Sequence, residues 1–279
     1  MAMPRAPQTI DTVPPFDAVP GFVADPLIVE DAEGWISVAD LVSGERLEDL
    51  FAMPERLWRA PEHAAAVLAW KTYTYRLAQP LAAAWTLARE IPLSSADNVL
   101  VQVLPAAPYI TVGLRRSTSA VLPTSPATRS HDAIVLPDEA TQLAFLRSTL
   151  IDQHLRPLME RTRETRRISE RVLWGQAAAA IAYAFADISA TAAMDTVRFT
   201  ELLPVQGLAG VGEDDTVWRN TCCLAFASPE LTACRDCVTV VRARRPLGRR
   251  SDRSDRSSER GDRGDRATLA KALGRTRRR

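Results

Sequence analysis

All four cysteines of this chain lie within seventeen consecutive residues near its C-terminal end. The stretch TCCLAFASPELTACRDC, residues 221–237, contains Cys222, Cys223, Cys234 and Cys237. Cysteine thiolates bind zinc and iron–sulfur clusters, carry out redox chemistry or pair in disulfides. A metal or iron–sulfur centre, a redox pair and disulfides are therefore the chemistries to weigh for this stretch.

The spacing of these cysteines, C-C-x10-C-x2-C, favours a metal centre and leaves its kind open. In C-x2-C, a tight turn points both thiolates at one ion. The side chains of Cys222 and Cys223 point apart in extended backbone, so both can be ligands only if the backbone turns there or the centre is large. A 2Fe-2S cluster, with its irons set apart, suits this better than one tetrahedral zinc, although four thiolates satisfy either. Redox-active or structural thiols remain as a further interpretation.

The start of the chain and its apolar stretches predict a cytoplasmic protein without membrane insertion. The start, MAMPRAPQTIDTVPPF, lacks the charged segment and apolar run of a signal peptide. No apolar stretch reaches the roughly 18 residues that a membrane helix needs. Thiols stay reduced in the cytoplasm, and a bond between the adjacent Cys222 and Cys223 would strain the disulfide torsion. We therefore do not expect disulfides.

The formal charge of +1 conceals an acidic body and a basic tail. Residues 242–279 carry 15 Lys or Arg and 5 Asp or Glu, whereas residues 1–241 carry 20 and 29. Ser-Asp-Arg and Gly-Asp-Arg triplets leave the tail almost nothing apolar to bury, so we expect it to be disordered. Its interleaved Asp residues argue against nucleic-acid binding by counterion release.

The apolar pattern predicts helices before and after a group of strands. Helical spacing begins at Pro61, where Pro80 should break or kink the run, and it returns after Pro137 and Asp138. Another helix should begin at Ser169, a plausible N-cap. A last short helix is expected in DTVRFTELLP, ending before a proline. The β-branched segments predict strands, and they are residues 98–104, 109–115 and 133–136.

A few strands between helical layers make a mainly helical α+β fold. We divide the chain by composition into four parts. They are a proline-rich N-terminal arm and lead-in (1–60), a mainly helical α+β domain (61–217), an iron–sulfur-binding segment (218–241) and the Arg/Asp/Ser-rich tail (242–279).

Two motifs resemble the FhuF-type ferric siderophore reductases. The sequence RNTCCLAF…ACRDC is similar to their C-terminal signature, and its matching residues are Arg219, Cys222, Cys223, Leu224, Cys234 and Cys237. The stretch HLRPLMERTRETRRISERVLWGQAAAA resembles helices shared with related siderophore synthetases, and its matching residues are His154, Leu155, Pro157, Leu158, Trp174 and Gly175. The likeness covers residues 150–240 and is weaker from residue 60. Arg235 stands where the family often has glycine, a place where positive φ would strain it.

The resemblance implies a 2Fe-2S oxidoreductase with Cys222, Cys223, Cys234 and Cys237 as cluster ligands. Its implied reaction is the one-electron reduction of a ferric siderophore, which releases Fe(II) and serves iron homeostasis. The chain has no Gly-rich dinucleotide fingerprint, so we expect electrons from a separate ferredoxin, flavodoxin or flavin reductase. The acidic body favours a neutral or cationic chelate, such as a hydroxamate type. We also expect the cluster to lie exposed near the surface.

Other notable side chains have plainer interpretations. We expect His154 to be a core histidine, and His63 and His131 to be surface residues. Gly175 should pack closely against another element. The arginine run at residues 161–167 should be a solvated helix end. Three scattered histidines support no catalytic triad, and the absence of a phosphate loop counts against an ATP-using synthetase.

Two functions from other classes remain as alternatives. One is an iron–sulfur redox-sensing regulator that uses its Arg-rich tail on DNA, against which no helix-turn-helix pattern is evident. The other is a zinc-stapled interaction domain without chemistry.

Overall fold

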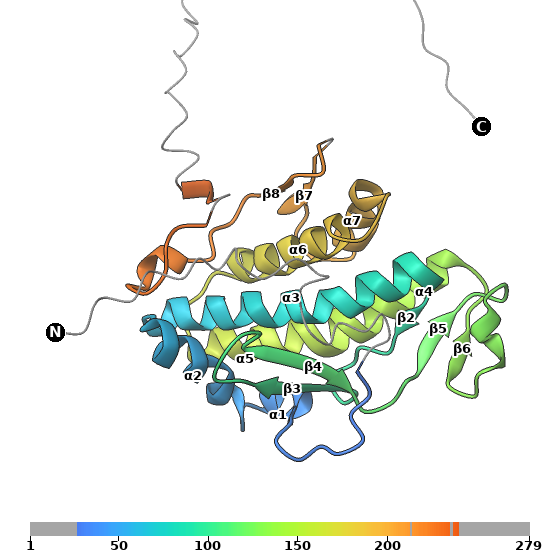
Figure 1. Cartoon of the computed structure of the whole chain (residues 1–279), viewed down its shortest axis with the longest axis horizontal. Coiled ribbons are helices and arrows are strands. Elements are labelled where there is room, and N and C mark those ends of the chain that lie inside the picture. The colour runs from blue at the N-terminus through green and yellow to red at the C-terminus, as the bar shows by residue number, and fades with distance from the viewer. Residues whose placement is uncertain (1–26, 213, 235–236, 240–279) are drawn as a thin grey trace, which may run out of the picture. The chain divides into compact units, whose positions relative to one another are not determined.

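The computed structural model describes residues 27–212, 214–234 and 237–239, and two long helices form its centre (Figure 1). Helix α3 (Glu62–Ala88) packs along α6 (Glu170–Ala186). Both are apolar over most of their surface, and Trp70, Trp85 and Trp174 are among the largest fully buried side chains. The chain divides into two units, residues 1–242 and 243–279, and every described residue belongs to the first.

Helix α3 runs through Pro80 without ending there. A proline inside a helix removes one hydrogen bond and costs about 3 kcal/mol. Leu77 and Leu81 on either side of Pro80 are buried in the core. Tertiary packing of both halves offsets the local cost, so of the expected break or kink the break is wrong, and the kink stays a prediction.

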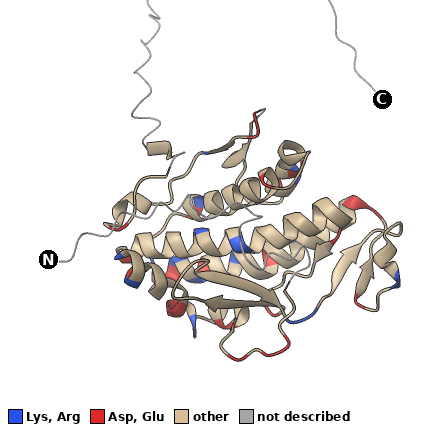
Figure 2. Cartoon of the chain, in the orientation of Figure 1, with Lys and Arg blue, Asp and Glu red and all other residues tan. Residues whose placement is uncertain are grey.

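The charged residues of α6 gather at its N-terminal end (Figure 2). Glu170 and Arg171 open the helix, and no further charge follows until Asp187 at its C-cap. A helix that is apolar all round is buried, and here α3, α7 (Ala192–Thr200) and the C-terminal strands cover it. Ser169 occupies the N-cap position, as predicted, although its side chain makes no cap hydrogen bond.

Four shorter helices complete the helical part, one of them packed against α3 and the others against the strands or other helices. They are α1 (Val38–Ser43), α2 (Leu47–Trp58), α4 (Glu139–Leu146) and α5 (Arg156–Thr165). The lead-in that was expected before residue 61 therefore includes two helices, α1 and α2, while residues 1–26 lie outside the described part of the chain. Helix α4 begins as expected, with Asp138 accepting a hydrogen bond from the Thr141 amide.

A π-helix, Arg147–Leu155, joins α4 to α5 without interruption. Pro157, which has no amide hydrogen, lies two residues after this π-helical stretch, in the first turn of α5. π-Helical turns are rare and often occur at functional sites. The stretch places His154 in the core.

The strands form three small sheets. In the first, β1 (Ile36–Ser37), β3 (Val99–Val103) and β4 (Ile110–Leu114) are antiparallel, with Val101 opposite Val112. The second contains β2 (Ile91–Pro92), β5 (Ser119–Val121) and β6 (Ala133–Val135). The third is the hairpin of β7 (Ala209–Val211) and β8 (Val217–Arg219). The predicted strands are confirmed as β3, β4 and β6, and the mainly helical α+β class is confirmed with them.

No helix among the described residues is long and apolar enough to cross a membrane.

Candidate metal centre

The cysteine segment leaves the β7–β8 hairpin and is seated on α6 through Thr221. Arg219 ends β8. Thr221 lies two residues further along the chain, directly before Cys222 and Cys223. A Cβ added at Gly175 would lie 2.1 Å from Thr221 Oγ1, so only glycine leaves room for this side chain. Gln176 Nε2 donates a hydrogen bond to the same hydroxyl at 3.2 Å. The expectation that Gly175 admits another element is confirmed, and that element is the start of the cysteine segment.

The loop between the two cysteine pairs is held against α2. The Ser228 hydroxyl donates to the carbonyl of Trp58, the last residue of α2. Arg59 forms a salt bridge with Glu230 at 3.3 Å. Ser228 and Leu231 are buried. These contacts fold the ten-residue loop back so that Cys234 returns to Cys223.

The four sulfurs form two pairs. The Sγ atoms of Cys223 and Cys234 are 3.1 Å apart, within hydrogen-bond reach for thiols. The charge of Cys237 acts on Cys222, so these two thiols are neighbours as well. Cys223, Cys234 and Cys237 are 1%, 7% and 3% exposed, while Cys222 is half-buried. The expected exposed centre is therefore open only at Cys222, because the loop folds over the other three sulfurs.

A left-handed turn at Leu224 directly follows the two adjacent cysteines. Leu224 has φ of 60°, in the left-handed region that costs a non-glycine residue about 1 kcal/mol. Its amide donates a hydrogen bond to Cys222 Sγ at 3.4 Å. Cys222 and Cys223 have different neighbours, Cys237 and Cys234, so adjacent cysteines whose side chains diverge can both face a centre. Arg235 lies outside the described residues.

The inner pair, Cys223 and Cys234, lies in a cationic environment. The hydrogen bond from the Cys234 thiol lowers the pKa of Cys223 to about 6 against the effect of burial, and the charges of Lys71 and Arg219 lower it further. The same hydrogen bond and burial raise the pKa of Cys234. Burial raises the pKa of Cys222. In the metal-free protein, Cys223 is therefore the first of these three thiols to ionise.

The donor set consists of four thiols arranged two by two. Within the described ranges, no three His, Cys, Asp or Glu side chains converge as ligands for one ion. The thiols instead lie two by two, and two thiolates per iron is the ligand set of a 2Fe-2S cluster with four cysteines. The cations beside the inner pair suit the negative charge of such a cluster. The residues present therefore fit an iron–sulfur centre.

His154 lies in the core, where both ring nitrogens have partners. Its Nε2 bonds with the Tyr73 hydroxyl, and its Nδ1 donates to the Ser94 carbonyl at 2.6 Å. Burial lowers the pKa of His154 to about 4, so the ring is neutral at pH 7. Its expected packing role is confirmed, and the exposed His63 and His131 confirm their surface placement.

The arginine run of α5 is only partly solvated. Arg163 and Arg167 are exposed as predicted. Arg166 has a side chain only 14% exposed, paired with Glu48 and Glu55, and Arg161 Nε donates to the Val42 carbonyl. The prediction of a solvated end fails for these two residues because α1 and α2 supply partners at a distance in sequence.

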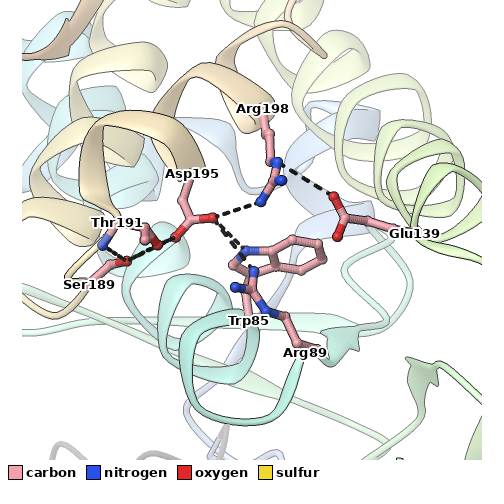
Figure 3. Close-up of polar contacts among 7 residues, drawn as sticks. All are labelled: Trp85, Arg89, Glu139, Ser189, Thr191, Asp195 and Arg198. Atoms are coloured by element: carbon pink, nitrogen blue, oxygen red, sulfur yellow. Dashed lines mark hydrogen bonds and ion pairs between the residues drawn. The ribbon is translucent and has the colours of Figure 1, made fainter. Parts of the chain in front are cut away.

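A second polar cluster lies where α7 meets the end of α3 (Figure 3). Asp195, 1% exposed, accepts hydrogen bonds from Trp85 Nε1 at 3.1 Å and from the hydroxyls of Ser189 and Thr191 at 2.8 and 2.6 Å. Burial opposes ionisation, but these bonds and the charge of Arg89 hold its pKa below the usual value. Both carboxylate oxygens are satisfied, so we assign the cluster a structural role.

Sequence reasoning missed the residues that seat and surround the cysteines. Lys71, Thr221 and Ser228 carry no motif, and their roles come from contacts across the fold. Lys71 gave one usable signal: the chain has two lysines, Lys71 and Lys271, and arginine at all its other basic positions.

The chain matches the family described as "Ferric iron reductase FhuF-like transporter" over residues 69–244. A search of curated proteins finds no match. Among solved structures, it is similar to the aerobactin synthetase IucA from a hypervirulent pathotype of Klebsiella pneumoniae, with 15% identity and a TM-score of 0.43. That likeness covers 56% of this chain and 28% of the synthetase.

Proposed function

Since the chain belongs to the FhuF-like ferric iron reductase family, we propose that it reduces siderophore-bound Fe(III) and that its four cysteines hold a 2Fe-2S cluster. The observation that carries the proposal is the convergence of these cysteines into two sulfur pairs, one of them in a cationic environment. A bound 2Fe-2S cluster supplies one-electron transfer.

The substrate chemistry needs a single electron. Siderophores hold Fe(III) through hard oxygen ligands, and such ligands hold Fe(II) far more weakly. One electron therefore opens the chelate and releases iron, without an acid or base from the protein. This agrees with the inner pair, on which the positive charges of Lys71 and Arg219 act.

The chain's own residues would hold, shield and expose the centre. The Thr221 contact with α6 holds the chain just before the first cysteine pair, and the Ser228 contact with α2 holds the middle of the ten-residue loop. Buried Cys223 and Cys234 are shielded from water, while half-buried Cys222 offers the route to the surface. Phe226, in the loop that follows the first cysteine pair, is 56% exposed and offers an apolar contact point.

We extend the proposal to the cellular setting. The protein would work in the cytoplasm and take electrons from a separate ferredoxin, flavodoxin or flavin reductase. The acidic balance of residues 1–241 favours neutral or cationic chelates, such as hydroxamates, over anionic ones.

The test is a single-turnover reaction under nitrogen. The dithionite-reduced protein, freed of excess dithionite, receives one equivalent of a ferric hydroxamate or of an anionic ferric catecholate, and an Fe(II)-specific chelator records iron release. We expect release from the hydroxamate, and none with Cys223→Ser. His131→Gln, which changes a 92% exposed potential metal ligand outside the segment, should behave as wild type. A reduced protein that releases iron from neither chelate contradicts the proposed reaction.

A further inference from the structure

The two sulfur pairs lie in unequal electrostatic surroundings. The charges of Lys71 and Arg219 act on both Cys223 and Cys234. The interactions that act on Cys222 come from Leu224, Thr239 and Cys237. Among the described residues, the positive charges that act on these sulfurs are therefore those beside the inner, buried pair.

Lys71 reaches this place from the middle of the fold. It lies on α3, one residue after the fully buried Trp70, and α3 contacts the 3-10 turn Ala225–Ala227 that follows Cys223. Lys71 is half-buried. The position holds the ammonium close to the sulfurs in a region where water screens charge weakly.

The Lys71 ammonium has no carboxylate partner in the part of the chain that the structure describes. It makes no salt bridge and no side-chain hydrogen bond there, whereas Arg59, Arg161 and Arg166 all pair with carboxylates. An unpaired, half-buried cation costs free energy, so its placement calls for a reason. Lys71 is also the single lysine of residues 1–242, in a chain that otherwise uses arginine.

We propose that Lys71, together with Arg219, is a charge partner of the Cys223–Cys234 pair that raises the reduction potential of the centre these sulfurs hold. The inference rests on the proposed function. Reduction adds one negative charge to the centre, and a nearby fixed cation stabilises the reduced form more than the oxidised form. Lysine suits this role because its ammonium is a compact point charge.

The experiment is a redox titration of the purified protein, followed by visible absorption and electron paramagnetic resonance. Lys71→Gln should shift the midpoint potential to a more negative value, while Lys71→Arg, which keeps the charge, should stay close to wild type. Arg76→Gln is the matched control, because it removes one half-buried cation from the same helix, and the charge of Arg76 acts on Tyr75. It should leave the midpoint unchanged. Iron and sulfide are assayed in every variant.

Each outcome decides the inference. Loss of the centre in Lys71→Gln but not in Lys71→Arg would also support a charge role. A Lys71→Gln protein with full iron and sulfide and a wild-type midpoint overturns the inference and leaves the proposed function standing. Loss of the centre in both Lys71 variants overturns it as well, because charge would not be what matters. A wild-type protein without iron and sulfide contradicts the proposed function itself.

Discussion

Gly175 decides whether the cysteine segment can reach its place. Gly175→Ala puts a methyl group 2.1 Å from Thr221 Oγ1 and 2.6 Å from Thr221 Cβ. We expect it to displace Thr221, to destabilise the fold by about 1–3 kcal/mol and to lower the iron content. Denaturant unfolding and an iron assay check this.

The double variant Gly175→Ala/Thr221→Ala provides the control. It removes the two closest atoms, Oγ1 and Cγ2, so it should recover part of the lost stability and iron content. If Gly175→Ala alone behaves as wild type, Thr221 does not seat the segment.

His154 predicts a pH dependence of stability. Its pKa is about 4 in the folded chain, because burial disfavours the charged ring, against 6.5 when unfolded. The unfolded state therefore binds more protons between these values, and stability falls as pH drops from 6.5 towards 4, by about 3 kcal/mol over the window. Denaturant unfolding between pH 6.5 and 5 measures the slope.

The exposed His63 supplies the comparison for this slope. His63→Gln should keep the pH dependence, whereas His154→Gln should flatten it. A wild-type free energy of unfolding that stays constant from pH 6.5 to 5 would show that His154 titrates normally in the folded chain.

At the residue scale, a role that follows from the type of the residue could be predicted from the sequence. A role that follows from where the fold places the residue could not. The cysteine spacing indicates a thiolate centre, and the lone histidine among apolar residues indicates a core residue. Lys71 and Thr221 matter because α3 and α6 bring them to the sulfurs. Such contacts join residues 45 or more positions apart, and no local pattern records them.

At the element scale, α7 depends on one buried carboxylate. Asp195→Ala leaves Trp85 Nε1 and the hydroxyls of Ser189 and Thr191 without their acceptor. Removing one member of a buried charged network costs about 3 kcal/mol, so we expect a loss of that size in the free energy of unfolding. Thermal and denaturant unfolding measure it.

Asp152 provides the matched control for Asp195. It pairs with Arg147 and Arg156 on the surface, where its side chain is 46% exposed. Since exposed ion pairs contribute about 0 to 1 kcal/mol, Asp152→Ala should have little effect. Equal losses in the two variants would mean that the buried network stabilises α7 no more than a surface pair does.

Element prediction succeeded for the longest periodic runs, and most of the missed strands are short, although three-residue β6 was predicted and twelve-residue α2 was not. The α3 and α6 runs and the β-branched strands β3 and β4 are long enough to show their period. β1 and β2 have two residues each, and β7 and β8 three, too few for any alternation to appear. The break expected at Pro80 does not occur, because burial of the residues on both sides offsets the local cost of the proline.

At the scale of the whole molecule, the basic tail differs from the rest of the chain in its composition and in its net charge. Residues 243–279 form their own unit, and residues 242–279 contain 15 of the 35 Lys and Arg. We expect a chain ending at residue 242 to keep the wild-type free energy of unfolding and iron content. A large drop in either would mean that the tail contributes to the folded unit.

The same truncation tests a docking role for the tail. Its positive charge could attract an acidic electron donor, an effect that salt screens. If so, truncation should slow electron transfer from ferredoxin at low ionic strength and change little at high ionic strength. Equal rates at both ionic strengths would leave the tail without this role.

The central claim is that the four cysteines hold a 2Fe-2S cluster, and its most direct test is the metal content of the anaerobically purified protein. The visible spectrum is recorded before and after dithionite, and iron, sulfide and zinc are assayed. We predict broad visible absorption that bleaches on reduction, with about two irons and two sulfides per chain. A colourless protein with one zinc per chain would contradict the account and make the cysteine segment a structural clasp.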